Sequence, residues 1–260
     1  MGDPDDVRSE NDDVLPENMA LAWGLRDRPA RGPKRSLSLA QVVATGIRVA
    51  QAEGLSAVSM SRVASELGVG TMSLYRYVPT KHDLLDLMAD TAYGPPPPPR
   101  APGEGWRPAL ARWGEGNLAA LRRQPWIRHV PISGPPIHPN SVRWMEYGLV
   151  ALRGTGLRAA ERISTILLVS GYARSWAVTS ADLAEAAARS GQTPEEVGRR
   201  YWQHLAMVTA PGPYPAIHEL IAEAGADEEE NEAEWRFGLD RVLDGVETLI
   251  KARAAGRTQP

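Results

Sequence analysis

The sequence predicts an all-α protein of about ten helices, divided into a small N-terminal domain and a larger C-terminal one. Three observations support this fold class. From Leu39 onward, apolar residues recur at three- and four-residue steps, as they do on one face of an α-helix. No segment alternates apolar and polar residues for long enough to form a sheet. Glycines, prolines and capping residues divide the periodic segments into helix-sized lengths. The 260 residues suffice for one small and one medium domain.

The first 35 residues are polar and predict a disordered or loosely ordered extension. Residues 1–25 carry seven acidic residues and one basic residue, and a turn of helix near Met19 would bury little surface by itself. Residues 26–35 form a basic arm, with five basic residues and one acidic residue in a chain of net charge −3. The arm is therefore the main electrostatic feature of the sequence.

Residues 36–94 predict the small domain, which starts with two helices. The first carries apolar residues at helical spacing from Leu39 and ends at Gly54, a residue suited to a C-terminal cap. The second begins after Ser59, whose side chain can cap the first turn. It ends at Gly68, where a helix needs a left-handed residue to stop.

Two further helices complete this domain. A short helix is expected over residues 71–78, because Pro79 cannot continue it with a normal hydrogen bond. The sequence Thr-Lys-His-Asp at 80–83 is a capping box for a fourth helix, which ends at Gly94. The proline-rich residues 95–104 predict an extended linker and a domain boundary.

Two short helices joined by a glycine-containing turn, with a longer helix before them, predict a helix-turn-helix domain. Its expected core residues are Val43, Ile47, Ala50, Val63, Leu67, Val69, Leu74 and Val78. This core leaves Met72, Ser73, Tyr75 and Arg76 on the outer side of the second short helix. Guanidinium, hydroxyl and methyl groups suit the major groove of DNA, where arginine pairs with guanine and methyl groups touch thymine.

Residues 105–254 predict the larger helical domain, and residues 255–260 a short tail. Six helices are expected in it, at 106–123, 140–153, 158–189, 194–208, 215–224 and 227–254. The last helix has one apolar stripe as wide as a buried helix face. The stripe consists of Trp235, Leu239, Val242, Leu243, Val246, Leu249 and Ile250.

Composition excludes several classes of protein. The chain has no cysteine, which excludes disulfides, zinc ribbons and cysteine nucleophiles, and its five histidines show no metal-ligand spacing. We therefore predict no metal and no cofactor. No apolar run reaches the ~18 residues of a membrane helix, and the acidic start is unlike a signal peptide, so we expect a cytoplasmic protein without a membrane partner. Motifs of nucleophilic or nucleotide chemistry are absent, and no catalytic residue is predicted.

Residues 39–92 closely resemble the DNA-binding domain of the tetracycline-repressor (TetR/AcrR) family of transcriptional regulators. The matching residues are Gly54, Ser59-Met60, Val63-Ala64, Glu66-Leu67-Gly68-Val69, Ser73-Leu74-Tyr75-Arg76-Tyr77, Lys81 and Leu84-Leu85. The resemblance implies that Ser59 caps a helix that abuts the DNA backbone and that Lys81 meets a phosphate. It also implies a recognition helix over 71–77, with contacts from Thr71, Met72, Ser73, Tyr75, Arg76 and Tyr77. The family often has longer side chains at positions 61 and 70, so we assign no contact there.

The C-terminal domain resembles the sensor domains of actinobacterial family members. The resemblance is carried by Gln124-Pro125-Trp126, residues 131–136, Trp144 and residues 152–156. It implies a homodimer in which 158–189 and 227–254 form a four-helix interface with their symmetry mates. It also implies an effector site with Trp126, His129, Trp144, Tyr147, Tyr172, Arg174 and Trp176. The other interpretation of these aromatic residues is that they are core residues of a helical domain.

Together these features predict a ligand-responsive regulator, most often a repressor in this family, that binds double-stranded operator DNA and a small-molecule effector. An aromatic or apolar, antibiotic-like effector is expected. The alternatives are an architectural DNA-binding protein without a ligand and a helical enzyme. The basic arm also has two interpretations. It is either a solubilising linker or a DNA-binding extension that uses Arg28, Arg31, Lys34 and Arg35.

Overall fold

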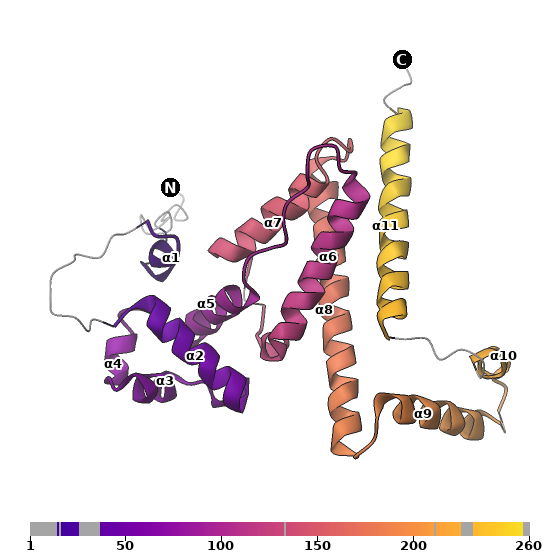
Figure 1. Ribbon diagram of the computed structural model, residues 1–260, viewed down its shortest axis with the longest axis horizontal. Coiled ribbons are helices and arrows are strands. Elements are labelled where there is room, and N and C mark those ends of the chain that lie inside the picture. Colours follow the sequence, from indigo (N-terminus) through magenta and orange to yellow (C-terminus); the bar gives the residue numbers. More distant parts are fainter. Residues whose placement is uncertain are drawn as a thin grey trace, which may run out of the picture. The chain divides into compact units, whose positions relative to one another are not determined.

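The computed structural model describes residues 15, 17–25, 37–132, 134–210, 212–224 and 231–256 (Figure 1). This described part is helical and contains no strand, which confirms the predicted fold class. The helices are α1 (Glu17–Ala22), α2 (Leu39–Glu53), α3 (Met60–Leu67), α4 (Thr71–Leu74), α5 (Lys81–Tyr93), α6 (Trp106–Arg123), α7 (Pro139–Ala151), α8 (Ala159–Arg189), α9 (Pro194–Thr209), α10 (Pro215–Ala224) and α11 (Asn231–Gly256), with short 3-10 helices at Leu55–Ala57 and Pro125–His129.

The chain forms two compact units that are not contiguous in sequence. The first unit comprises the described residues up to Pro95 together with His129–Met145. The second comprises Pro96–Arg128 together with the described residues from Glu146 onward. Helix α7 therefore begins in the first unit and ends in the second.

Local caps determine where the helices of the first unit begin and end. The side chain of Ser38 accepts a hydrogen bond from the backbone of Gln41 at the start of α2. Ser59 caps α3 in the same way, and Thr80 forms a capping box at the start of α5. Gly68 ends α3 with φ 67° and ψ 33°, a left-handed conformation that favours glycine. The caps at Ser59, Gly68 and Thr80 are those predicted from the sequence.

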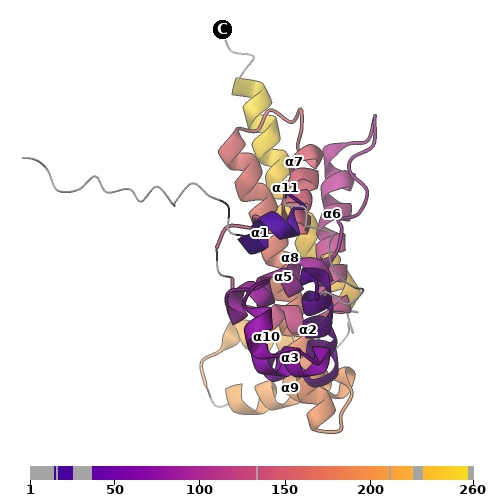
Figure 2. The same cartoon turned by 90° about the vertical axis from the view of Figure 1, so that its left-hand side faces the viewer.

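Helices α2, α3 and α5 pack around a small apolar core, and they lie together in both views (Figures 1 and 2). Side chains with no exposed surface in this core include Val42, Val63, Leu74, Val78, Leu84 and Met88. Gly46 permits the close approach of α2 and α5, because a Cβ atom there would lie 2.5 Å from Sδ of Met88. Helix α4, which lies between α3 and α5 in the sequence, buries Leu74 in this core.

Two local predictions for the first unit were wrong. Helix α4 ends at Leu74 and continues as a turn, in which the backbone N–H groups of Tyr77 and Val78 both bond to the carbonyl of Leu74. The extension was expected to hold at most a turn of helix that buries little surface, but residues 17–22 form α1. Met19 and Ala20 in α1 are buried, and Trp23 donates a hydrogen bond of 2.9 Å to the carbonyl of Ile137. Contacts with residues far along the chain therefore stabilise a helix that is too short to be stable alone.

The compact units divide the chain differently from the predicted domains. Residues 105–254 are predicted as one C-terminal domain, and within this range His129–Met145 makes its contacts with the first unit. The indole of Trp144 donates to the carbonyl of Gly94 (2.8 Å) and packs edge-on against Tyr93. These contacts join residues about fifty positions apart, and no local sequence pattern reports them.

The second unit is built on α8, which packs against both α6 and α11 (Figure 1). Two glycines allow the close contacts. A Cβ atom at Gly114 in α6 would lie 2.9 Å from Val169 in α8, and one at Gly148 in α7 would lie 2.9 Å from Ile166 in α8. Of the predicted α11 stripe, Trp235, Leu239, Leu243 and Val246 are buried, and the other three members are half-buried.

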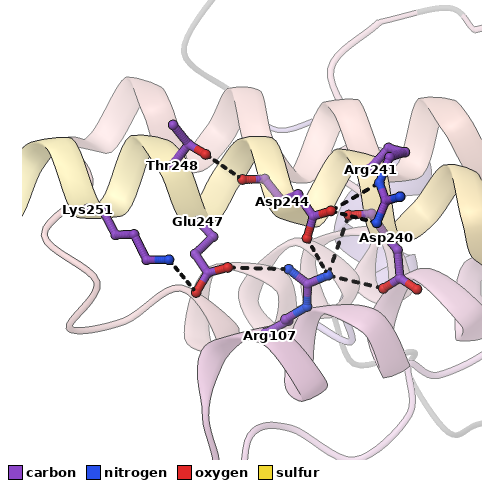
Figure 3. Close-up of polar contacts among 7 residues, drawn as sticks. All are labelled: Arg107, Asp240, Arg241, Asp244, Glu247, Thr248 and Lys251. Carbon is purple, nitrogen blue, oxygen red and sulfur yellow. Dashed lines mark hydrogen bonds and ion pairs between the residues drawn. The ribbon is translucent and has the colours of Figure 1, made fainter.

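An ion-pair network joins α6 to α11 (Figure 3). Arg107 of α6 lies 3.2 Å from Asp240, 2.7 Å from Asp244 and 3.8 Å from Glu247. The Arg107 guanidinium, and after it Arg241, lower the pKa of the Asp244 carboxyl. One arginine therefore balances much of the acidic face that α11 turns toward α6.

A second ion pair joins the start of α8 to the end of α11. The carboxylate of Glu161 accepts hydrogen bonds from Arg253 (3.0 Å) and from the backbone and guanidinium of Arg158 (both 2.8 Å). These bonds, with Arg253 the largest cause, lower the pKa of Glu161 from 4.5 to about 2. The stabilisation is therefore complete above pH 4.5 and is lost as the pH falls through about 2.

We expect Glu161→Gln to lower the thermal unfolding temperature at pH 7, and we expect this difference to shrink toward pH 2. The reason is that acid protonates the native carboxyl and weakens the same contacts. Circular dichroism melts at several pH values measure the effect. Glu219→Gln, at an exposed position of α10, is the control. A Glu161→Gln deficit that is equal at every pH contradicts this account.

Candidate DNA-binding and effector sites

The outer face of the predicted recognition helix is free of core contacts. Met72 and Tyr75 are 77% and 43% exposed, and Arg76 is also exposed, whereas Leu74 is fully buried. Thr71 and Ser73 are half-buried at the start of α4. The buried leucine fixes the orientation of this short helix, and three side chains that suit base edges point away from the core.

Residues beside α4 have different roles from one another. The Ser59 hydroxyl accepts a hydrogen bond of 3.1 Å from the backbone of Arg62. The Tyr77 hydroxyl donates to the carbonyl of Leu37 (2.8 Å), so it ties the turn after α4 to the start of α2. Lys81 is exposed at the first position of α5. Ser59 and Tyr77 therefore have structural roles in this unit, and Lys81 is exposed at the surface.

Not every cation in the domain is available to DNA. Arg62 of α3 donates to Glu53 (2.8 Å) and to Glu66 (2.8 Å), and these two carboxylates, Glu66 first, raise its pKa. Arg28, Arg31, Lys34 and Arg35 of the basic arm lie outside the described residues. Their contact with DNA stays a prediction.

The second unit contains an aromatic cluster, defined here as Tyr172, Trp176 and Trp235. The rings of Tyr172 and Trp235 stack at 4.8 Å with an interplanar angle of 7°, and the Tyr172 hydroxyl donates to the carbonyl of Trp235 (3.2 Å). Trp176 lies 6.2 Å from Tyr172, and its indole nitrogen is buried without a hydrogen-bond partner. Buried indole N–H groups usually have partners, so this donor is suited to a ligand.

The seven predicted effector residues do not form one group. Tyr172 and Trp176 lie in the aromatic cluster, and Arg174 donates to the carbonyl of Arg128 (3.1 Å). Tyr147 is half-buried in α7. The buried Trp126 donates to the Gln124 side chain. The exposed His129 and the buried Trp144 belong to the first unit.

Two residues near these positions were missed by sequence reasoning. Trp235 was recognised only as part of an apolar stripe, which does not reveal its partner ring. The Arg128 side chain is 5% exposed and forms ion pairs with Asp182 (3.6 Å) and Glu185. The burial of Arg128 could not be predicted from the neighbouring sequence, because its carboxylate partners lie more than fifty residues away.

Two further findings concern other kinds of site. Across the described residues, no three histidine, aspartate or glutamate side chains are placed to hold a metal ion. None of the helices in those same residues is long and apolar enough to cross a membrane.

Comparison with known proteins identifies both parts of the chain. Residues 42–88 match the bacterial regulatory proteins of the tetR family, and residues 98–250 match the tetracyclin repressor-like C-terminal domain. The HTH-type transcriptional repressor DrrR1 of Streptomyces coeruleorubidus is 40% identical over 247 residues, which cover 95% of this chain and 90% of that protein. An HTH-type transcriptional regulator of Saccharopolyspora erythraea is 27% identical over 90% of this chain and 91% of its own length.

Solved structures share the fold. Apo ActR from Streptomyces coelicolor superposes with a TM-score of 0.68 and 23% identity, over 87% of this chain and 100% of that one. ActR in complex with actinorhodin gives a TM-score of 0.67 at 23% identity, over 83% of this chain and 96% of that one.

Proposed function

Because the chain belongs to the TetR family of transcriptional repressors, with a tetracycline repressor-like C-terminal domain, we propose that it binds a palindromic operator as a homodimer and is released by a small aromatic molecule. Membership in this family excludes the enzyme alternative. The observation that carries the proposal is the recognition face, where Met72, Tyr75 and Arg76 are exposed above the buried Leu74.

An exposed apolar face supports the homodimer. Leu167 and Leu168 of α8 are 61% and 55% exposed, and Phe237 of α11 is 63% exposed. Beside Leu168, the small residues Gly171 and Ser175 are also exposed, so another helix can approach closely. Large exposed apolar side chains on two helices that pack together suit an interaction surface, and a two-fold axis makes such a surface self-complementary.

The aromatic cluster supports an aromatic effector. The half-buried rings of Tyr172 and Trp176 offer apolar surface, and the buried indole nitrogen of Trp176 offers one donor. Sites for small molecules commonly combine apolar walls with a few polar groups. ActR, which shares the fold, has been crystallised with actinorhodin, so actinorhodin is a suitable first probe.

Operator binding by purified protein tests the proposal. The operator is selected from random duplexes, and fluorescence anisotropy then measures its affinity with and without actinorhodin. We expect a palindrome with half-sites about one helical turn or somewhat more apart. Binding of actinorhodin without any loss of operator affinity would favour the architectural alternative. Failure to select any palindrome would contradict the proposal as a whole.

Substitutions on the recognition face should separate base reading from phosphate binding. Tyr75→Ala or Arg76→Ala is expected to weaken the selected operator by about 1–3 kcal/mol if either residue reads a base, with less effect on unrelated DNA. Lys81→Ala is expected to weaken binding to all DNA sequences by a similar factor. It should also reduce the slope of log affinity against log salt concentration by about one, because one phosphate contact is lost.

Salt titrations with selected and random duplexes measure both effects. The same titration with Arg28, Arg31, Lys34 and Arg35 replaced by serine tests the basic arm without removing α1. A changed sequence preference with an unchanged salt slope in Lys81→Ala would show that its assigned role is wrong. An unchanged salt slope in the arm variant would identify the arm as a linker.

A further inference from the structure

The segment His129–Met145 belongs to the first unit, which contains the helix-turn-helix, although it lies within the sequence of the sensor domain. We infer that this segment carries the effector signal to the recognition helix, and that Asp90 is the positioning residue through which α5 follows it. The inference rests on the proposed function and specifies how that response is transmitted.

Asp90 in the last turn of α5 binds the first turn of α7. One carboxylate oxygen accepts hydrogen bonds from the backbone nitrogen (2.7 Å) and the hydroxyl (2.6 Å) of Ser141. The other accepts from the backbone nitrogen (3.1 Å) and the side-chain amide (3.2 Å) of Asn140. The backbone carbonyl of Asp90 accepts a further bond of 3.1 Å from that amide.

The position of this carboxylate makes the contact sensitive to displacement. Asp90 is only 8% exposed, and the C-terminal end of its own helix disfavours a negative charge. The free backbone N–H groups at the start of α7 compensate for both effects. If α7 moved away, a buried carboxylate would lose its partners, which is costly. Helices α5 and α7 therefore move together at this contact.

Other contacts fix the same segment within the first unit. Trp144 bonds to the carbonyl of Gly94 and packs against Tyr93 at 5.2 Å, so the end of α5 is held at a second point. Trp23 bonds to the carbonyl of Ile137, just before α7 begins. The segment is thus held near its middle and near its end.

Where the segment joins the second unit, tight contacts follow within a few residues. Gly148 lies one helical turn after Trp144, and a Cβ atom there would be 2.9 Å from Ile166 and 3.1 Å from Trp113. Arg128, immediately before the segment, accepts a bond from Arg174. Tyr147 therefore follows the segment by two residues, and Arg174 bonds to the residue before it, so two predicted effector residues adjoin its ends along the chain.

The other end of α5 adjoins the recognition helix. Thr80 caps α5 directly after the turn that follows α4, and Leu84 and Met88 are fully buried in the core that also holds Leu74. A displacement of Asp90 along α5 therefore reaches Lys81 and the orientation of α4. Two recognition helices that change their separation no longer fit both half-sites.

Gly148→Ala provides a test that needs no effector, because its Cβ atom would crowd the side chains of Ile166 and Trp113, so that α7 is expected to shift in the second unit. We expect this variant to weaken operator binding by roughly 5-fold to 150-fold, the usual range of coupling between sites. Amide hydrogen exchange in α5 of the free protein should change as well. In an Asp90→Ala background, Gly148→Ala should change neither the operator affinity nor the amide exchange in α5 by more than about twofold. The reason is that the effects of coupled residues are not additive.

Gly198→Ala, where a Cβ atom meets nothing within 4 Å, and Asp86→Ala, on the same helix, control for the two substitutions. If Asp90→Ala fails to fold, Asn140→Ala/Ser141→Ala removes the side-chain donors from the other partner. Equal effects of Gly148→Ala in both backgrounds, or none on α5 exchange, overturn the inference. If the unaltered protein binds no palindrome, the proposed function fails, but the exchange data still decide the role of Asp90.

Discussion

Replacing Leu168 with arginine is expected to convert the protein to a monomer and to weaken operator binding by about 100-fold or more. The exposed apolar side chains on α8 and α11 would pack against their symmetry mates in the proposed dimer. Near a two-fold axis, the new guanidinium would face its own copy in a low-dielectric contact. A monomer binds one half-site, so the gain from linking two binding events, commonly 10²–10⁴, is lost.

Sedimentation at micromolar concentration and operator titration measure the two effects. Leu220→Arg is the matched control, because Leu220 is 48% exposed on α10, outside the proposed interface. We expect Leu220→Arg to remain dimeric and to bind the operator normally. A Leu168→Arg protein that stays dimeric, or a monomer that binds the operator with native affinity, would refute the proposed interface.

The second large effect is expected at the aromatic cluster. Gly238 of α11 lies against Tyr172, and a Cβ atom at this position would lie 2.0 Å from the tyrosine hydroxyl oxygen. Gly238→Ala must therefore displace the Tyr172 ring from Trp235 and break its hydrogen bond. We expect actinorhodin, if it binds the native protein, to release the operator about 5-fold to 150-fold less effectively from this variant.

Operator affinity without effector should be unchanged in Gly238→Ala, because the side chain that it displaces, Tyr172, belongs neither to the recognition face nor to the contacts of Gly148 in α7. Gly245→Ala, on the same helix, is the control, since a Cβ atom there meets nothing within 4 Å. Anisotropy titrations with increasing actinorhodin compare the three proteins. A native response in Gly238→Ala would place the effector elsewhere in the sensor domain.

Local sequence signals predicted most of the helices. Helix α6 begins and ends at the predicted residues, and α8, α9 and α10 differ from prediction by at most one residue at either end. The reason is that periodic apolar residues and caps act over a single turn. Features that depend on distant partners were not predicted, such as α1, which is stabilised by contacts of Trp23 and its neighbours.

The candidate sites show the same distinction. The exposure of Met72, Tyr75 and Arg76 followed from the spacing of core residues along one short helix. The pairing of Tyr172 with Trp235 could not be predicted, because it joins helices more than sixty residues apart. The assignment of Trp144 to an effector site came from resemblance, whereas its indole is bonded to Gly94 in the first unit. Which of these residues touch DNA or effector stays a prediction.

The interleaving of the two units has a consequence for how such a repressor can be divided or recombined. A fragment that stops at Pro95 keeps every residue of the helix-turn-helix but leaves Asp90 and Tyr93 without their partners in α7. The contacts of the helix-turn-helix unit therefore extend beyond one contiguous stretch of the gene. A chimera that joins this helix-turn-helix to a foreign sensor domain keeps these contacts only if it also includes His129–Met145, so exchange at a single crossover point loses them.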